Sequence, residues 1–205
     1  MRFDEHYYFI EGDCPMTDEM KEHFKKRTDK HIGLVQKYCG KIDDLGQKDY
    51  DGIVERGEIH DASKYEEPEY TPYVYLTWDY KCKDEGVDSG FSKEIKDNMN
   101  TATNHHVKHN RHHVEAHTDQ DDVINREDRD KPPEEMVDGT KMSKLDLAEM
   151  CSDWCAMSEE RGNTPQSWAD KNVNVRWKFT DEQKKMIYDL LNLIWDSDEI
   201  KKTKD

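Results

Sequence analysis

The chain has 205 residues, of which 33% are hydrophobic, 10% are aromatic and 38% are charged, and its formal net charge is −16. This length suits one domain, so we expect a single domain over residues 1–205 with a thin apolar core. The negative charge argues against non-specific binding to nucleic acid, whose phosphates the protein would repel. A small anionic substrate remains compatible with this charge if cations line a local pocket.

Membrane segments and cysteine motifs are not evident in the sequence. It has no run of about 18 apolar residues, and acidic residues stand where a signal peptide would carry basic ones. We therefore expect a cytoplasmic protein with no membrane partner. The five cysteines lack CxxC spacing, which favours free thiols over a disulfide framework. Cys151 and Cys155, four residues apart on a predicted helix, leave a soft-metal site as the alternative.

Capping residues and hydrophobic periodicity predict helices in the first half of the chain. Residues 17–42 begin with Thr17 as a cap and place His31 on the apolar face of an amphipathic helix. Residues 70–80 contain a Tyr-Val-Tyr-Leu-Thr-Trp run that fits a helix or a strand. The next helix is predicted from Ser92 to about His117.

The second half of the chain is predicted to contain a loop and two further helices. Residues 118–139 are acidic and lack periodicity, which indicates a surface loop inserted in the domain. A capped helix follows over residues 143–162, and a short turn begins at Thr164. Thr180 and Gln183 form a capping box before a terminal amphipathic helix. The expected fold class is therefore all-α.

Six of the ten histidines lie between residues 105 and 117. On a continuous helix, His106, His109, His113 and His117 would share one face. Neutral imidazole is a favoured ligand of zinc, iron, nickel and similar ions, so this face predicts metal or substrate binding. The alternative is a solvated helix that happens to be rich in histidine.

Two further features lie outside this stretch. His60 and Asp61 are adjacent, and at a helix end both side chains can turn toward one ion. Asp153 lies beside the apolar stripe of a predicted helix, where a carboxylate usually has a partner. Taken alone, each feature also fits an ordinary surface or rim residue.

The ordered set resembles a known superfamily. His31, then His60-Asp61, then the middle histidines and Asp153 are similar to the H…HD…D pattern of the HD-domain metal-dependent phosphohydrolases. More narrowly, the stretches HDASK, HHVKHNRHHVEA and EMCSDWCAM resemble an uncharacterised phage-encoded HD-like group, over roughly residues 30–157. The resemblance implies a compact HD-like helical bundle that hydrolyses a nucleotide or a related small phosphate ester, in the host cytoplasm if the protein is phage-encoded.

The resemblance also implies roles for individual residues. One or two divalent ions (Mn, Fe, Zn, Ni, Co or Mg) would be bound. The ligands of the first ion would be His31, His60, Asp61 and Asp153. A second ion would take His106 and His113, with His112 as the substitute, although binuclear relatives usually separate the two histidines more widely.

The same resemblance implies which residues take part in catalysis and in substrate binding. Asp61 would bridge two ions or orient the attacking water, and His112 would protonate the leaving oxygen. Lys64 resembles the lysine of the HDxGK version, which reaches a substrate oxyanion, and Arg111 is a second candidate for the phosphate. A solvent-facing lysine and a surface ion pair are the respective alternatives.

Two other functions remain open at this point. Mixed-valent di-iron oxygenases of the same superfamily have a similar histidine and aspartate set, with a lysine after HD. A non-catalytic phage-type inhibitor of a host factor would suit the charge of −16, but it would not require a histidine cluster.

Overall fold

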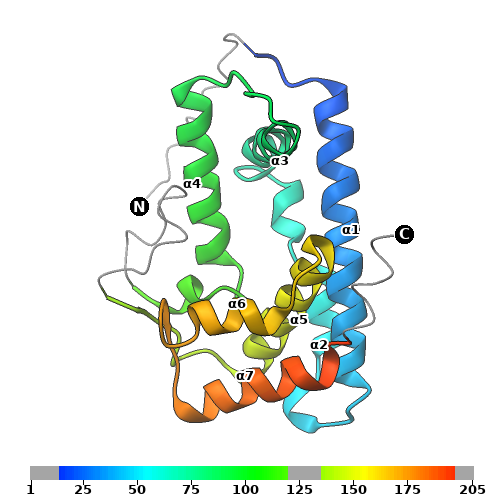
Figure 1. Ribbon diagram of the computed structural model, residues 1–205, viewed down its shortest axis with the longest axis vertical. Helices are drawn as coiled ribbons and strands as arrows, with labels where there is room; N and C mark the ends of the chain where they lie inside the picture. Colours follow the sequence, from blue (N-terminus) through cyan, green and yellow to red (C-terminus); the bar gives the residue numbers. More distant parts are fainter. Residues whose placement is uncertain (1–13, 120–134, 197–205) are drawn as a thin grey trace. The chain divides into compact units, whose positions relative to one another are not determined.

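The computed structural model describes residues 14–119 and 135–196, and its described part is mostly helical (Figure 1). This confirms the all-α class. The helices are α1 (Asp18–Asp43), α2 (Ile53–Ile59), α3 (Tyr70–Asp84), α4 (Lys93–His109), α5 (Lys144–Arg161), α6 (Pro165–Asn172) and α7 (Asp181–Ile194). Shorter elements are the 3-10 turns η1 (Lys48–Tyr50), η2 (Ala62–Tyr65) and η3 (Val114–His117), and the strands β1 (Val137–Asp138) and β2 (Trp177–Lys178). No helix of this described part combines the length and apolar character of a membrane span.

The backbone packs into two compact units. Unit 1 takes its described residues from Met1–Arg27 and Ser63–His106, and unit 2 takes them from Thr28–Ala62 and Val107–Asp205. Helices α1 and α4 therefore contribute residues to both units. The expectation of one domain over residues 1–205 stays a prediction.

The core of unit 1 is built around α3, the aromatic segment that fitted either a helix or a strand. It is a helix, and Pro72 lies in its first turn, where a missing backbone N–H is tolerated. Tyr73, Val74 and Leu76 from this helix are buried together with Met20 and Phe24 of α1.

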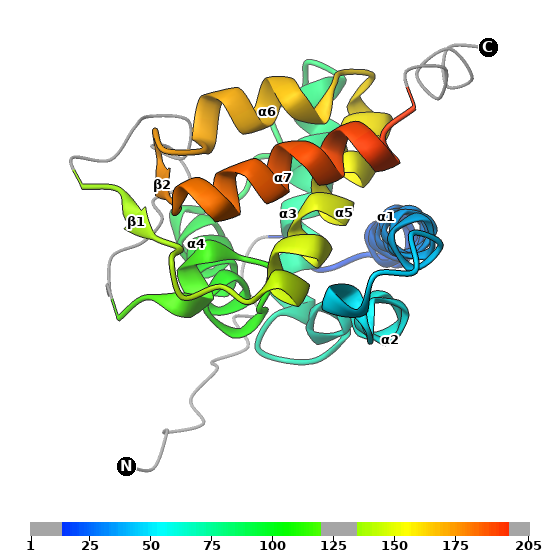
Figure 2. The same cartoon turned by 90° about the horizontal axis from the view of Figure 1, so that it is seen from below.

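Helix α5 is the centre of unit 2. It contacts α2, η1, α6 and α7, and α6 and α7 run side by side (Figure 2). The predicted caps are present: Ser143 accepts a hydrogen bond from the backbone N–H of Asp146, and Thr180 accepts one from that of Gln183. Gly162, with φ 68°, ends α5 in the left-handed conformation that glycine adopts most easily.

Three predicted segments differ from the structure. Helix α4 ends at His109 rather than near His117, and the backbone N–H of His113 closes a turn on the carbonyl of Asn110 at 3.0 Å. The segment from Pro165 is an eight-residue helix, α6, rather than a short turn. Within the predicted loop 118–139, β1 pairs in parallel with β2, while residues 120–134 lie outside the described residues.

Burial explains the early end of α4. Val114 and Glu115 are 1% exposed, and the Trp177 indole donates a hydrogen bond to the Glu115 carboxylate at 3.0 Å. A continued helix could not satisfy these contacts, so tertiary packing outweighs local periodicity here. The four histidines predicted on one helical face therefore do not share one.

Candidate metal centre

The candidate site lies within unit 2 and draws on four segments of the chain. His31 comes from the middle of α1, and Asp153 comes from α5. His60 follows the last residue of α2, and Asp61 comes next. His112 enters from the turn after α4. Four of these five residues are buried, and Asp153 is partly buried.

The end of α2 aims two adjacent side chains into the site. Asp61 has φ 58°, a left-handed conformation that few residues other than glycine adopt, although aspartate and asparagine tolerate it better than most. This reversal places Asp61 Oδ2 3.7 Å from His60 Nε2. The left-handed backbone at Asp61 therefore brings the two side chains together, because a continued helix would separate them by about 100°.

The remaining distances connect both carboxylates to the imidazoles. His31 Nε2 lies 3.1 Å from Asp153 Oδ1 and 3.8 Å from Asp61 Oδ2. His112 Nε2 lies 3.7 Å from the other oxygen of Asp61, Oδ1. Two ligands bound about 2.1 Å from one ion at tetrahedral or octahedral angles are about 3.0–3.4 Å apart. The observed separations are close to that range.

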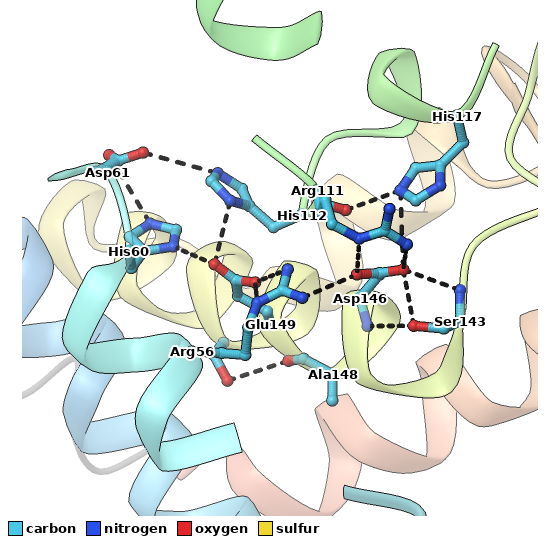
Figure 3. A network of polar contacts seen from close by, with 11 residues as sticks. Arg56, His60, Asp61, Arg111, His112, His117, Ser143, Asp146, Ala148 and Glu149 are labelled. Atoms are coloured by element: carbon cyan, nitrogen blue, oxygen red, sulfur yellow. Dashed lines mark hydrogen bonds and ion pairs between the residues drawn. The ribbon is translucent and has the colours of Figure 1, made fainter. Parts of the chain in front are cut away.

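Two glutamates hold the opposite edges of the imidazole rings. Glu149 Oε1 is 2.9 Å from His60 Nδ1 and 3.2 Å from His112 Nδ1 (Figure 3). Glu160 Oε2 is 3.3 Å from His31 Nδ1. An ionised carboxylate only accepts hydrogen bonds, so each Nδ1 is the donor. In His60 and His112 this leaves Nε2 with the lone pair that a metal ligand needs.

One nitrogen of the site is buried without a hydrogen bond. His60 Nε2 has no hydrogen-bond partner in the parts of the chain that the structure describes, and its side chain is 0% exposed. A buried polar atom in this state costs free energy. The donor set around it, imidazole nitrogen and carboxylate oxygen, is one that binds divalent metals. His31, His60 and Asp61 together could hold such an ion.

The pKa values of the site reflect its many carboxylates. Burial lowers the pKa of His31, but hydrogen bonds to Asp153 and Glu160 outweigh it and raise this pKa to about 9. For Asp153, by contrast, burial raises the pKa. The hydrogen bond from His31 outweighs this effect and holds the pKa of Asp153 well below its usual range. His31 and Asp153 therefore form a charged pair joined by a hydrogen bond from Nε2.

The pKa values of Glu149 and His112 are both lowered. Burial raises the pKa of Glu149, but hydrogen bonds from His112 and His60 bring it down to about 2, so the carboxylate is ionised. Burial lowers the pKa of His112, and the neighbouring His60 lowers it further. His112 is therefore neutral, the form that binds metals.

The residues predicted for a second ion and for phosphate binding belong to both units. His106 belongs to unit 1, where its Nδ1 bonds to Glu69 at 2.8 Å. Lys64 also belongs to unit 1, and its ammonium lies 5.1 Å from the ring centre of Tyr73. The pairing of His106 and His113 as ligands of a second ion stays a prediction. His113 is in unit 2, with its ring 4.1 Å from that of His112.

Arg111 forms the ion pair that was the alternative to phosphate binding. Its Nε and Nη2 donate to the two oxygens of Asp146 at 3.1 and 2.8 Å (Figure 3). This two-point contact matches the planar fork of a guanidinium and satisfies much of its donor capacity. Arg56 also binds Asp146, at 3.1 Å, and contacts Glu149 from the same side.

Sequence reasoning missed the two glutamates. Asp146, Glu149, Asp153 and Glu160 are spaced by three, four and seven residues, which places them on one face of α5. The other face carries apolar side chains of the core, such as Leu147 and Cys151. A carboxylate stripe on a helix that is otherwise buried was the available signal.

Fold and site define an all-helical protein with buried histidine and carboxylate clusters that could hold a metal ion. The chain belongs to DUF5662, a family of unknown function, which matches residues 20–195. Searches of curated proteins and of solved structures gave no significant match.

Proposed function

We propose that this protein binds a divalent metal ion through His31, His60, Asp61 and Asp153 and hydrolyses a small phosphate ester. The observation that carries the proposal is the orientation of His60. Its Nδ1 is held by Glu149, and its buried Nε2 faces Asp61 without a hydrogen bond in the described part of the chain. A cation at this point would satisfy the nitrogen and neutralise the carboxylates around it.

The resemblance to the HD-domain phosphohydrolases supports the same four residues independently of their geometry. A bound divalent ion would polarise a phosphoryl oxygen and make a water molecule acidic enough to attack at neutral pH. Asp61 is our candidate for orienting that water, because its two oxygens face different imidazoles. His112 is neutral and lies beside Asp61, so it is our candidate for moving a proton to or from the reacting oxygens.

A second candidate function is the di-iron oxygenase chemistry found in the same superfamily. One observation favours it: Asp61 presents Oδ2 to His31 and His60, and Oδ1 to His112, as a carboxylate shared by two ions would. Two bound irons and an oxygen-dependent reaction would support this candidate. A protein that binds one ion, or that binds two ions and releases phosphate, would instead support hydrolysis.

The test begins with the full chain purified without a histidine tag, stripped with a chelator and reloaded with single metals. We expect a saturable site for Mn, Fe, Co, Ni or Zn, a rise in melting temperature with added metal, and phosphate release from a nucleotide panel. Asp61→Asn and Asp153→Asn should abolish metal binding and activity together. Asparagine is chosen at residue 61 because it tolerates the φ of 58° there better than alanine does.

Asp51→Asn is the matched control, because Asp51 is exposed and outside the site. It should keep metal, activity and melting temperature. Full metal occupancy and activity in both site variants would overturn the proposal, as would a wild-type protein that binds none of the metals.

A further inference from the structure

We propose that a pocket beside Asp153 binds an aromatic ring of the substrate, so that the phosphate ester is one carried by a nucleobase or another aryl group. This inference rests on the proposed hydrolysis and adds the class of substrate. It draws only on residues of unit 2.

The pocket shares a residue with the candidate metal centre. Asp153, which lies 3.1 Å from His31 through one carboxylate oxygen, also lines the pocket. The cavity measures about 80 Å³, well below the roughly 300–1,000 Å³ that enclose a whole small-molecule ligand. It therefore suits one part of a substrate, with the remainder extending toward Asp153 and the imidazoles.

The walls of the pocket are rich in indole rings. Trp154, Trp168 and Trp177 line it together with Met157. The planes of Trp154 and Trp177 differ by 17°, with centroids 5.8 Å apart, and Trp168 meets Trp177 at a steep angle of 64°. Any of the nucleobases can stack on such indole surfaces, because every base has a π face. Trp168 is only half-buried, so part of its surface is reachable from solvent.

Cationic groups at the same pocket favour a substrate that is also anionic. Arg176 is 7% exposed, lies 3.9 Å from Glu115 and sits 5.2 Å from the ring centre of Trp177. Arg161 lines the pocket, is exposed and pairs with no carboxylate among residues 14–119 and 135–196. In a protein of net charge −16, an exposed arginine in the lining of a pocket gives local attraction for a phosphate-bearing ligand.

The kinetic test compares two phosphate esters that differ only in the base. Adenosine monophosphate and ribose 5-phosphate are offered to the metal-loaded full chain. We expect KM to be at least tenfold lower for adenosine monophosphate. Trp168→Leu should bring the two KM values together, while Trp78→Leu, a half-buried tryptophan outside the pocket, should leave the tenfold difference in place. Equal KM values in the wild-type protein would overturn the inference and leave the proposed hydrolysis intact.

A binding test separates failure of the pocket from failure of the hydrolase. Adenosine, which has no phosphate, is titrated into metal-free protein while tryptophan fluorescence is recorded. Saturable quenching that Trp168→Leu removes and Trp78→Leu retains would support the pocket, even if no phosphate ester were hydrolysed. Absence of quenching in the wild-type and control proteins would overturn it.

Discussion

Glu149 accepts a hydrogen bond from His60 Nδ1 at 2.9 Å, and this contact determines which nitrogen of His60 faces Asp61. The two residues are 89 positions apart in the sequence, so only the fold brings them together. The first prediction follows from this contact.

Glu149→Gln should weaken metal binding about 10–100-fold without removing any of the four proposed ligands. A neutral amide holds His60 and His112 less strongly than an ionised carboxylate, and it can also present an N–H to them. Isothermal titration of the stripped protein measures the affinity. Glu182→Gln, an exposed change on α7, is the matched control and should have no effect. Unchanged affinity in Glu149→Gln would mean that this carboxylate only supports the fold.

Arg111→Met should leave metal content unchanged and alter kcat/KM little, because the guanidinium is engaged by Asp146. The side chain is 59% exposed, so the lost ion pair should cost only about 0–1 kcal/mol of stability. Metal analysis and phosphate-release kinetics check the two statements. A large rise in KM would support Arg111 as a phosphate-binding residue.

Lys64→Met tests the other predicted phosphate contact. If its ammonium reaches the substrate, KM should rise or kcat should fall while metal content stays constant. Lys93→Met, at an exposed position on α4, is the control. Loss of metal from Lys64→Met would instead identify a residue that shapes the site.

Gly139→Ala should destabilise the protein by about 1–3 kcal/mol. An added Cβ would lie 2.7 Å from Phe179 Cε1 and 3.0 Å from Val114 Cγ1, both of which are packed in the core of unit 2. Gly33→Ala, inside α1 where the new Cβ would meet nothing within 4 Å beyond its chain neighbours and the backbone of its own helix, should stabilise by about 0.5–1 kcal/mol. Urea unfolding of both variants gives the comparison. Equal midpoints would show that the packing at Gly139 yields easily.

Thiol reactivity should separate Cys14 from the other cysteines. Cys14 is partly exposed, whereas Cys39, Cys151 and Cys155 are fully buried and Cys82 is 8% exposed. Burial raises the pKa of Cys39 to about 11 and raises those of Cys151 and Cys155 as well, so these groups remain thiols at pH 8. An aromatic disulfide reagent should modify Cys14 first and the others only on unfolding. Rapid modification of Cys151 in the folded protein would contradict this arrangement.

Elements that depend on local interactions were predictable from the sequence. The caps of α5 and α7 are set by residues three positions apart, Ser143 with Asp146 and Thr180 with Gln183, and both were predictable for that reason. The choice of His31, His60, Asp61 and Asp153 as candidate ligands also came from sequence order, through the HD-domain resemblance. Their role as ligands stays a prediction, although all four lie together in unit 2.

The end of α4 and the orientation of the imidazoles depend on contacts between distant segments. The periodicity of residues 105–117 favoured a longer helix, but the burial of Val114 and Glu115 outweighed it. The partners of His60 and Arg111 come from α5, 89 and 35 positions away. Helical spacing shows that Asp146 and Glu149 share a face of α5, but packing determines which side chains that face meets. Hydrogen bonds between such distant segments therefore had to be found in the folded chain.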